Sequence, residues 1–490
     1  MSKKVIVIGA GIAGLTAAIY AQRSGFDVTL IEQHSIVGGM CTSWRRKGYL
    51  FEGAMHWLTG SSPNTEVHQI WRDTGALSDT VPVELYDPFS SVEHKGQVIH
   101  LYRDIHKTAE HLRAVSPEDA PHIRQLVKEV KKLSRMQMPI FDVKGVKAEH
   151  PKSMSLGFLL NMLPAMPTIN RLGKLTCGEY VKRLTHPGIR QLLSVVPEEY
   201  AASSLVFTLT TLHTGDGGHP AGGSLPMVER MEQTFKDLGG NLLLNTKVEK
   251  VKIENGSVKG VILADRTLEA DAVIVAQETI AALANLFDTP LSDPWLKTLR
   301  ENTKSTVCTF VSIGVRAELP ESTLPAWQLD TPITYAGETI NKLGFYVNTG
   351  PGYAPEGGTA LTTALLGDTY DFWKKAKEEG RYKEEKQALA EQISRALYEK
   401  YPQMAGKIEV IDIATPLTYE RYTGAHHGSW MTTIGPEDNM RPSYPGTVEA
   451  VQGLYFAGHR LMPPGGLPSA AASGRQAAQL VCKQFDAVFR

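Results

Sequence analysis

Residues 5–14, VIVIGAGIAG, decide the fold of this chain. The first four residues form a short, β-branched apolar run, which is typical of a parallel strand buried on both faces. A GxGxxG motif follows directly, and residues 15–20 then show helical periodicity. A strand, a glycine-rich turn and a helix in this order predict a dinucleotide-binding unit.

Each glycine of this turn has its own physical purpose. Gly9 permits the tight turn, Gly11 lets backbone amides approach a pyrophosphate, and Gly14 allows the helix to pack closely on the sheet. The N-terminus of the helix adds partial positive charge for the phosphates. The residues predicted to bind the cofactor here are Gly9, Gly11, Ile12, Ala13 and Gly14.

The next strand and turn favour a flavin cofactor. Residues 27–31 read as a second strand that ends at Glu32, whose carboxylate would accept hydrogen bonds from a ribose and repel a 2′-phosphate. Gly38 and Gly39 follow six residues later, as in the flavoprotein form of the motif. No second GxGxxG follows a strand, so the sequence predicts FAD and no dedicated NAD(P)H domain.

Later segments complete the nucleotide-binding fold. A helix is expected from Gly222-Gly223 to residue 238, followed by a strand at 241–244. Val248 would offer backbone groups to the adenine, and Asn255-Gly256 predicts a hairpin. Residues 272–276 read as another buried strand.

The C-terminal region supplies the last strand and helix. Residues 453–457 read as a strand, and the helix that opens at 469–474 would direct its N-terminus at the flavin ring and stabilise negative charge there. The remaining residues predicted to bind FAD are Met40, Val248, Gly458, His459, Gly466, Leu467 and Pro468.

Both chain ends and a middle segment therefore build one domain, and the intervening segments build another. The predicted fold is α/β, with a Rossmann-like FAD-binding domain and an interleaved α+β substrate-binding domain. The predicted segments are 1–75, 211–284 and 446–490 for the FAD-binding domain, and 76–210 and 285–445 for the substrate-binding domain.

Composition excludes several classes of function. The chain has 490 residues and a formal net charge of −1, which argues against nucleic acid as a partner. Its 4 cysteines lie far apart without metal-binding spacing, so free thiols in a reducing, cytoplasmic location are expected and no metal site is predicted. No uncharged apolar run reaches the roughly 18 residues of a membrane span.

Four motifs together resemble a known family. They are VIVIGAGIAGL at 5–15, GYLFEGAMHWLTG at 48–60, TPLTYERYTGAHHGS at 415–429, and LYFAGHRLMPPGGLPSAAASG at 454–474. With these the chain resembles the phytoene desaturase, carotenoid isomerase and retinol saturase family of FAD oxidoreductases, within the amine oxidase-like flavoproteins. The resemblance implies a glutathione reductase-like nucleotide domain. Met40-Cys41 and His459 depart from the Arg and Asp that many relatives have there.

The resemblance implies desaturation, saturation or isomerisation of a hydrophobic polyene or isoprenoid, such as a carotenoid or retinoid. Electrons would then pass to or from a diffusible acceptor or donor. One alternative is an amine or amino-acid oxidase with a polar or aromatic-caged site. Another is a non-catalytic lipid-binding relative such as the Rab escort proteins, against which the intact GxGxxG and Glu32 count.

The candidate catalytic residues are His56, Tyr419 and Glu420. His56 would act as a proton donor or acceptor beside the flavin, or else be a hydrogen-bonded loop histidine. Tyr419 and Glu420 fall in a stretch that the resemblance places near the flavin. Glu52, in the same stretch as His56, is expected to be structural.

Residues 154–166, MSLGFLLNMLPAM, form the most apolar segment of the predicted substrate-binding domain. The segment suits a buried core helix. It equally suits the flexible wall of a lipid tunnel that touches a membrane surface, and the sequence leaves both open.

Overall fold

The computed structural model describes residues 2–53, 55–134, 136, 140–153, 156–319, 323–348, 352–433, 435–438, 441–462 and 465–490. The predictions for residues 154, 155, 463 and 464 lie outside the described residues. No helix of the described part is both long and apolar enough to cross a bilayer.

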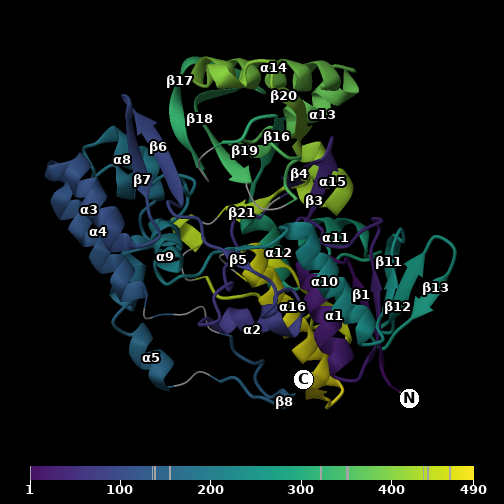
Figure 1. Ribbon diagram of the computed structural model, residues 1–490. Coiled ribbons are helices and arrows are strands. Elements are labelled where there is room, and N and C mark those ends of the chain that lie inside the picture. Colours follow the sequence, from purple (N-terminus) through teal and green to yellow (C-terminus); the bar gives the residue numbers. More distant parts are fainter. Residues whose placement is uncertain are drawn as a thin grey trace.

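A five-stranded parallel sheet, in the order β10-β2-β1-β14-β22, forms the centre of the nucleotide-binding fold (Figure 1). β1 lies in the middle of this sheet, and residues 5–8 are 0–4% exposed, which confirms the predicted strand buried on both faces. The strands are β1 (Lys4–Ile8), β2 (Asp27–Ile31), β10 (Asn241–Leu243), β14 (Ala272–Val275) and β22 (Leu454–Phe456).

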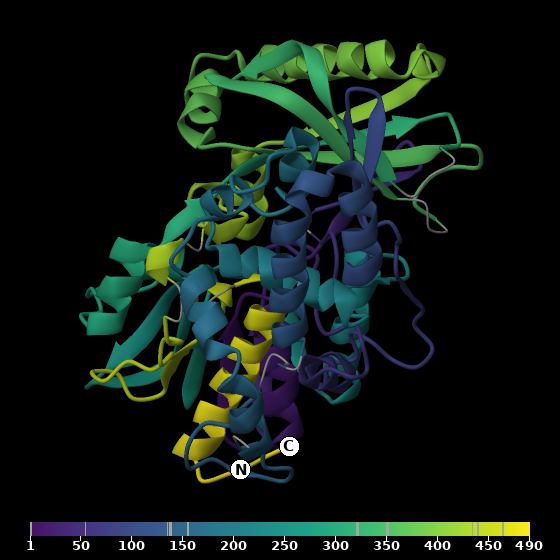
Figure 2. The ribbon, with the colours of Figure 1, turned by 90° about the vertical axis from the view of Figure 1, so that its left-hand side faces the viewer.

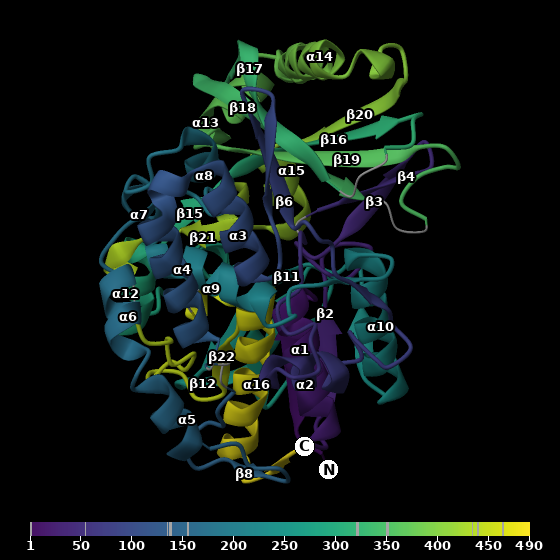
Figure 3. The ribbon, with the colours of Figure 1, turned by 60° about the vertical axis from the view of Figure 1, so that its left-hand side comes forward.

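Helices cover one face of this sheet and a small antiparallel sheet covers the other. α1 and α16 lie side by side in both Figure 1 and Figure 3, and a Cβ on Gly474 would lie only 2.2 Å from the carbonyl oxygen of Ala13, so glycine is what lets these helices approach. The elements are α1 (Ile12–Arg23), α10 (Ser224–Asp237), α16 (Gly466–Gln484), β11 (Val248–Glu254), β12 (Ser257–Leu263) and β13 (Thr267–Glu269). The predicted hairpin at Asn255-Gly256 joins β11 to β12.

A seven-stranded mixed sheet, in the order β20-β16-β19-β18-β17-β6-β7, forms the other large layer. Helices α13 and α14 pack on its outer face, at the top of Figure 2. The elements are β6 (Ser90–His94), β7 (Gln97–Leu101), β16 (Cys308–Val315), β17 (Thr323–Tyr335), β18 (Glu338–Asn348), β19 (Thr359–Leu366), β20 (Ile408–Ala414), α13 (Tyr370–Glu378) and α14 (Tyr382–Lys400). The charged stretch 374–400 is divided between these two helices.

A helical layer lies beside the seven-stranded sheet and shares one apolar core with strands β6 and β7. Its helices are α3 (Ile105–Val115), α4 (Ala120–Leu133), α5 (Leu156–Met162), α6 (Met166–Leu172), α7 (Cys177–Val181), α8 (Pro187–Leu192) and α9 (Ala202–His213). The remaining elements are β3 (Ser43–Arg46), β4 (Tyr49–Glu52), α2 (Glu66–Asp73), β5 (Val83–Glu84), β8 (Lys147–Ala148), β9 (His219–Pro220), α11 (Thr279–Asn285), α12 (Pro294–Asn302), β15 (Lys304–Thr306), α15 (Pro416–Thr423), β21 (Met431–Thr433) and β23 (Val488–Phe489), with 3₁₀ turns at Pro117–Asp119, Pro402–Met404, His426–Gly428, Pro436–Asp438 and His459–Leu461.

The apolar segment predicted at 154–166 is divided into α5 and the start of α6. Pro164 follows α5 and Pro167 lies in the first turn of α6, where proline is tolerated, so one continuous helix is unfavourable here. Leu160 and Leu163 are 60% and 64% exposed, so this segment is not a fully buried core helix.

These layers give the α/β fold that the sequence predicts, with a Rossmann-like domain. The five-stranded sheet takes its strands from residues 4–31, 241–275 and 454–456, whereas the seven-stranded sheet takes them from residues 90–101 and 308–414. We propose the division into segments 1–75, 76–210, 211–284, 285–445 and 446–490, and this alternation of strands between sheets supports it.

Candidate active site

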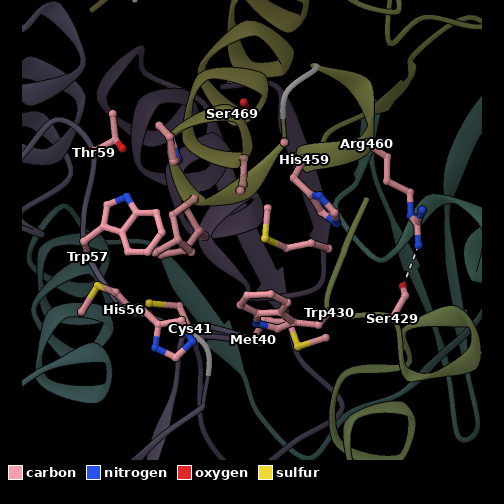
Figure 4. Close-up of a pocket in the computed structure, with 18 of the residues that line it drawn as sticks. Met40, Cys41, His56, Trp57, Thr59, Ser429, Trp430, His459, Arg460 and Ser469 are labelled. Atoms are coloured by element: carbon pink, nitrogen blue, oxygen red, sulfur yellow. Dashed lines mark hydrogen bonds between the residues drawn. The ribbon is translucent and has the colours of Figure 1, made fainter. Parts of the chain in front are cut away.

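A cavity of about 1620 Å³ extends from the glycine turn after β1 to the seven-stranded sheet. Sites for a single small molecule usually measure about 300–1,000 Å³. The cavity therefore has room for a cofactor and a second ligand together, and Figure 4 shows the side chains that surround it.

The glycine turn forms one end of the cavity. Gly9, Gly11, Ile12 and Ala13 line it, and α1 starts here with no side-chain cap on its first amide groups. Uncapped amides at a helix N-terminus are a binding site for phosphate. Gly14 does not line the cavity, and a Cβ there would lie 1.8 Å from the carbonyl oxygen of Gly9, in keeping with the packing role predicted for it.

Glu32 lines the cavity at the end of β2. Its two carboxylate oxygens accept hydrogen bonds from the amides of Ala10 (2.8 Å) and His34 (2.9 Å). Burial raises the pKa of the carboxyl group, and these amide donors oppose the rise. Each carboxylate oxygen keeps a free lone pair for the hydroxyl of a ribose.

Gly38, Gly39 and Met40 lie directly against the glycine turn and line the cavity. The amide of Gly38 donates to the carbonyl of Ala10 at 2.8 Å. Gly38 has a φ of 114°, and a Cβ there would lie 2.4 Å from the carbonyl oxygen of Cys41, so only glycine suits this close approach.

The N-terminus of α16 faces the cavity from another side. Gly466, Leu467 and Pro468 line the cavity, and α16 has no side-chain cap. Gly458 and His459 line it from the preceding turn. A second uncapped helix end can stabilise negative charge on a ligand.

Polar atoms at this end lack partners. His459 Nδ1 and Ser469 Oγ are buried and accept or donate no hydrogen bond within the described residues. Burial, with the charge of Arg460 beside it, lowers the pKa of His459 to about 4, so its imidazole is neutral at pH 7. Buried polar groups are normally satisfied, which points to a polar ligand.

Two uncapped helix ends, a ribose-facing acid and unpartnered polar side chains fit FAD. The predicted binding residues would hold its pyrophosphate at the start of α1 and its ribose at Glu32, and Val248 lines the adenosine side of the cavity. When bound, FAD supplies the two-electron chemistry of the site.

A buried ion pair that the sequence did not reveal supports the turn after β22. Arg460 Nε lies 2.6 Å from Glu278 Oε1, and an Arg460 Nη2 group donates to Ser429 Oγ at 2.6 Å (Figure 4). Glu278 also accepts hydrogen bonds from two amides at the start of α11. The pair therefore connects the His459 turn, α11 and the segment that carries Trp430, all of which border the cavity.

His56 stands in the middle part of the cavity. Its ring stacks on Tyr346 with centroids 3.8 Å apart, and Phe310 and Trp430 lie at 6.0 Å and 5.8 Å. Burial, and secondarily the neighbouring His219, lowers the pKa of His56 to about 3, and its Nε2 has no hydrogen-bond partner in the described chain. His56 is therefore neutral at pH 7, with a polar nitrogen available to a ligand.

The loop that carries His56 is fixed at three points. The Tyr419 hydroxyl donates to the carbonyl of Gly53 at 2.7 Å, and Asp216 accepts from the amide of Gly60 at 2.8 Å. Between them, His219 Nε2 donates to the carbonyl of His56. These bonds hold the imidazole in one position against the cavity.

Tyr419 and Glu420 themselves do not line the cavity. Tyr419 is buried behind the His56 loop, and Glu420 accepts the hydroxyl of Tyr370 at 2.9 Å. The same stretch reaches the cavity instead through Thr423, Ser429 and Trp430. A short helix, α15, directs Tyr419 and Glu420 away from the wall, which the motif alone could not show.

Tyr346 also lines the cavity, and no sequence motif singles it out. Burial raises the pKa of its phenol to about 12, yet 42% of its surface is open. Its open surface therefore faces the internal cavity. Its place depends on pairing between β18 and distant strands, for which a single sequence carries no signal.

Glu52 is structural, as expected. It is fully buried and accepts hydrogen bonds from Ser224 Oγ (2.5 Å) and the Tyr353 hydroxyl (3.1 Å). Burial raises the pKa of Glu52 to about 7. The carboxyl group thus joins the start of α10 to a loop of the second large layer.

Comparison with known proteins agrees with this geometry. The model of the family of flavin-containing amine oxidoreductases matches residues 12–482. The chain is 24% identical to a lycopene-forming phytoene desaturase of Paracoccus sp. (strain N81106 / MBIC 01143), covering 98% of this chain and 97% of the relative. It is 22% identical to the all-trans-retinol 13,14-reductase of Danio rerio (93% and 82% covered) and 24% identical to prolycopene isomerase 1 of an Oncidium hybrid cultivar (97% and 83% covered).

Solved structures share the fold. An oxidoreductase from Methanosarcina mazei has a TM-score of 0.61 at 20% identity, with 96% of this chain and 98% of that chain covered. Putrescine oxidase with bound putrescine has a TM-score of 0.60 at 16% identity, with 98% and 99% covered. The predicted resemblance and the predicted FAD cofactor are confirmed: the chain belongs to the family of flavin-containing amine oxidoreductases and is a FAD-dependent oxidoreductase.

Proposed function

We propose that this enzyme desaturates, saturates or isomerises carbon–carbon bonds of a hydrophobic polyene, such as a carotenoid or retinoid. The observation that carries this proposal is the single cavity that continues from the FAD-binding residues to the seven-stranded sheet. The names of the relatives, which specify phytoene, retinol and prolycopene, support it.

The walls beyond His56 suit an apolar ligand. Phe207, Tyr346, Leu366 and Trp430 line this part of the cavity, and the first three keep 39%, 42% and 44% of their surface open. Apolar side chains gain free energy when a hydrocarbon displaces water from them. Such walls orient a polyene and exclude water from the reacting carbons.

The carboxylates that line the cavity already have hydrogen-bond or ion-pair partners, which argues against the amine oxidase alternative. Their partners in the described chain are the amides of Ala10 and His34 for Glu32, the amides of Gly60 and Ser62 for Asp216, Lys247 for Glu249, Arg460 for Glu278, and Arg441 for Asp438. A buried ammonium group needs a carboxylate or an equivalent set of acceptors. Apart from Glu32, whose remaining lone pairs lie at the end of β2 and suit a ribose, these carboxylates are already engaged by other groups of the chain.

We propose that His56 is a catalytic group that acts in its neutral form. A neutral imidazole offers one N–H donor and one acceptor nitrogen, so His56 can orient a polar atom or hold a proton in transit. Its pKa of about 3 argues against an imidazolium at pH 7. The geometry favours a positioning role for Tyr419, through the carbonyl of Gly53, over the catalytic role predicted from the sequence.

Product analysis tests the proposed function. The FAD-loaded enzyme is incubated with phytoene and a quinone acceptor, with retinol under reducing conditions, and with prolycopene, because the electron donor or acceptor is proposed to be diffusible. A product that differs from its substrate by two hydrogens, or a geometric isomer of the same mass, is expected. Hydrogen peroxide formed from putrescine or other amines, with all polyenes unchanged, would contradict the proposal.

We also propose that the protein is cytoplasmic and touches a membrane through the α5–α6 segment. Leu160 and Leu163 are exposed, whereas Met162 and Met166 line the cavity, so the apolar surface is continuous with the cavity wall. The four cysteines are buried and unpaired, which supports a reducing compartment.

Vesicle co-sedimentation tests the membrane contact. Replacing Leu160 and Leu163 by Ser should reduce binding to phospholipid vesicles severalfold, because two apolar side chains no longer enter the interface. Leu238→Ser, on an exposed leucine after α10, is the matched control and should bind as the wild type does. Equal sedimentation of all three proteins would refute the contact.

A further inference from the structure

Helix α9 has two different faces inside the protein. Leu205, Val206 and Leu209 belong to the apolar core that α9 shares with α4 (Figures 1 and 3). Ser204, Phe207, Thr208 and Thr211, at helical spacing, line the cavity instead. A wall that contacts only hydrocarbon would have no need of these hydroxyl groups.

The hydroxyl protons of this face are already used. Thr208 Oγ1 donates to the carbonyl of Ser204 at 2.9 Å, and Thr211 Oγ1 donates to the carbonyl of Phe207 at 3.0 Å. A hydroxyl that donates to its own helix keeps its oxygen lone pairs as acceptors. The face therefore presents hydrogen-bond acceptors to the cavity.

A hydrogen-bond donor lies next to Thr211. Trp57 projects into the cavity (Figure 4), and its indole N–H makes no hydrogen bond within the described residues. A Cβ placed on Gly217, which does not itself line the cavity, would lie 3.3 Å from Thr211 Cγ2 and 3.4 Å from Trp57 Cδ1, so the two side chains are neighbours. Phe89 packs edge-on against Trp57, with ring centroids 5.5 Å apart.

We propose that Trp57 and Thr211 form a subsite for the hydroxyl end of the substrate, so that the enzyme prefers polyene alcohols to polyene hydrocarbons. This inference rests on the proposed function and specifies its substrate class. An alcohol oxygen accepts the indole N–H while its proton is donated to Thr211 Oγ1.

Other polar end groups satisfy only half of this arrangement. A carboxylate accepts from Trp57 but has no proton for Thr211, and an ammonium donates to Thr211 but cannot accept from Trp57. A hydrocarbon leaves the Trp57 N–H without water and without a partner, and it offers no proton to the Thr211 oxygen. The pair therefore selects for a hydroxyl group.

Binding of three matched retinoids tests the subsite. All-trans-retinol, its methyl ether and the hydrocarbon anhydroretinol are titrated into the FAD-loaded protein, and their dissociation constants are measured from retinoid fluorescence. Retinol should bind about tenfold more tightly than the other two, because each supplies at most one of the two hydrogen bonds.

Thr211→Val keeps the shape of the wall, Trp57→Phe keeps an aromatic ring there, and each variant removes one polar group. Each variant should reduce the preference for retinol to about twofold or less. Thr234→Val is the matched control, since Thr234 Oγ1 makes the same bond to a helix carbonyl on α10, away from the cavity, and it should keep the tenfold preference. The flavin absorption spectrum of each variant reports that it is folded and loaded.

The outcomes separate the subsite from the function on which it rests. Equal binding of the three retinoids to the wild type, or a preference that survives in both Thr211→Val and Trp57→Phe, overturns the subsite and leaves the polyene function intact. Failure of all three retinoids, together with phytoene and prolycopene, to bind the FAD-loaded wild type overturns the proposed function and the subsite with it.

Discussion

Two histidines in the cavity wall are neutral chiefly because they are buried. His56 and His459 have pKa values lowered to about 3 and about 4, and each leaves one ring nitrogen without a partner in the described chain. Here the neutral His459 and the Arg460–Glu278 pair keep this end of the cavity free of an uncompensated anion.

The depressed pKa of His459 predicts a dependence of stability on pH. Between about pH 4 and 6.5 the unfolded chain binds a proton at this residue and the folded protein does not, so the free energy of unfolding falls as the pH is lowered through this window. In His459→Asn the unfolding free energy should no longer show this part of its dependence on pH. For a pKa lowered from 6.5 to about 4, this part amounts to at most about 3 kcal/mol. Urea unfolding at pH 4.5, 5.5 and 6.5 measures it, and parallel curves for variant and wild type would contradict it.

Glu52 predicts a slope of the opposite sign. Its pKa is raised to about 7 by burial, so between about pH 4.5 and 7 the folded protein holds a proton that the unfolded chain releases. This contribution to stability is complete at low pH and is lost as the pH rises towards 7. Glu52→Gln should remove it, again up to about 3 kcal/mol. The difference between variant and wild type should therefore shift in favour of Glu52→Gln as the pH rises, and a constant difference would disprove the assignment.

At the scale of single elements, two glycines at the start of α1 have different roles: we expect Gly11 to serve ligand binding and Gly14 to serve folding. A Cβ on Gly11 would meet only the carbonyl oxygen of Gly38 at 3.9 Å, whereas a Cβ on Gly14 would lie 1.8 Å from the carbonyl oxygen of Gly9. Gly11 therefore leaves space for a ligand, and Gly14 leaves space for the close contact between α1 and the turn after β1.

Two alanine variants test this distinction. Gly11→Ala should weaken FAD binding tenfold or more, because its methyl group enters the cavity, while the unfolding free energy of the apoprotein changes by less than about 0.5 kcal/mol. Gly14→Ala should lower that free energy by about 2 kcal/mol or more through overpacking. Isothermal titration with FAD and urea unfolding provide the two readouts. Unchanged FAD affinity in Gly11→Ala would show that this turn does not bind the pyrophosphate.

The sequence predicted those elements whose signals are local. The run at 5–8, the glycines after it, Glu32 and the hairpin at Asn255-Gly256 all follow from short-range rules of burial and turn geometry. The segment 154–166 shows where such local prediction fails. Its apolar composition suggested one helix, although Pro164 favours a break between two helices.

The site was predicted only in part for the same reason. The residues predicted to bind FAD lie on the motifs themselves, and all of them except Gly14 line the cavity. Tyr346 and Thr211 reach the cavity through strand pairing and helix packing across the chain, which leave no pattern in one sequence, whereas Trp57 lies in the motif at 48–60. Tyr419 lies in the right stretch but behind the wall, because the direction of a side chain depends on the packing of α15.

At the scale of the whole molecule, two sheets and a helical layer surround one cavity. The five-stranded sheet supplies the cofactor end, and the seven-stranded sheet with α9 supplies the other end (Figures 1 and 2). Because the chain alternates between these layers, neither end of the cavity is complete without segments from several parts of the sequence. A ligand that bridges the two ends therefore stabilises the arrangement of both layers.

Anaerobic flavin spectroscopy tests the central claim most directly. Three mixtures are prepared without oxygen. The enzyme with oxidised FAD is mixed with a polyene, the enzyme with chemically reduced FAD is mixed with a polyene, and the enzyme with oxidised FAD is mixed with putrescine. We expect a polyene to bleach or restore the visible flavin band, or to shift it on binding, and we expect putrescine to leave the band unchanged. Bleaching by putrescine, with no response to phytoene, retinol or prolycopene, would contradict the account.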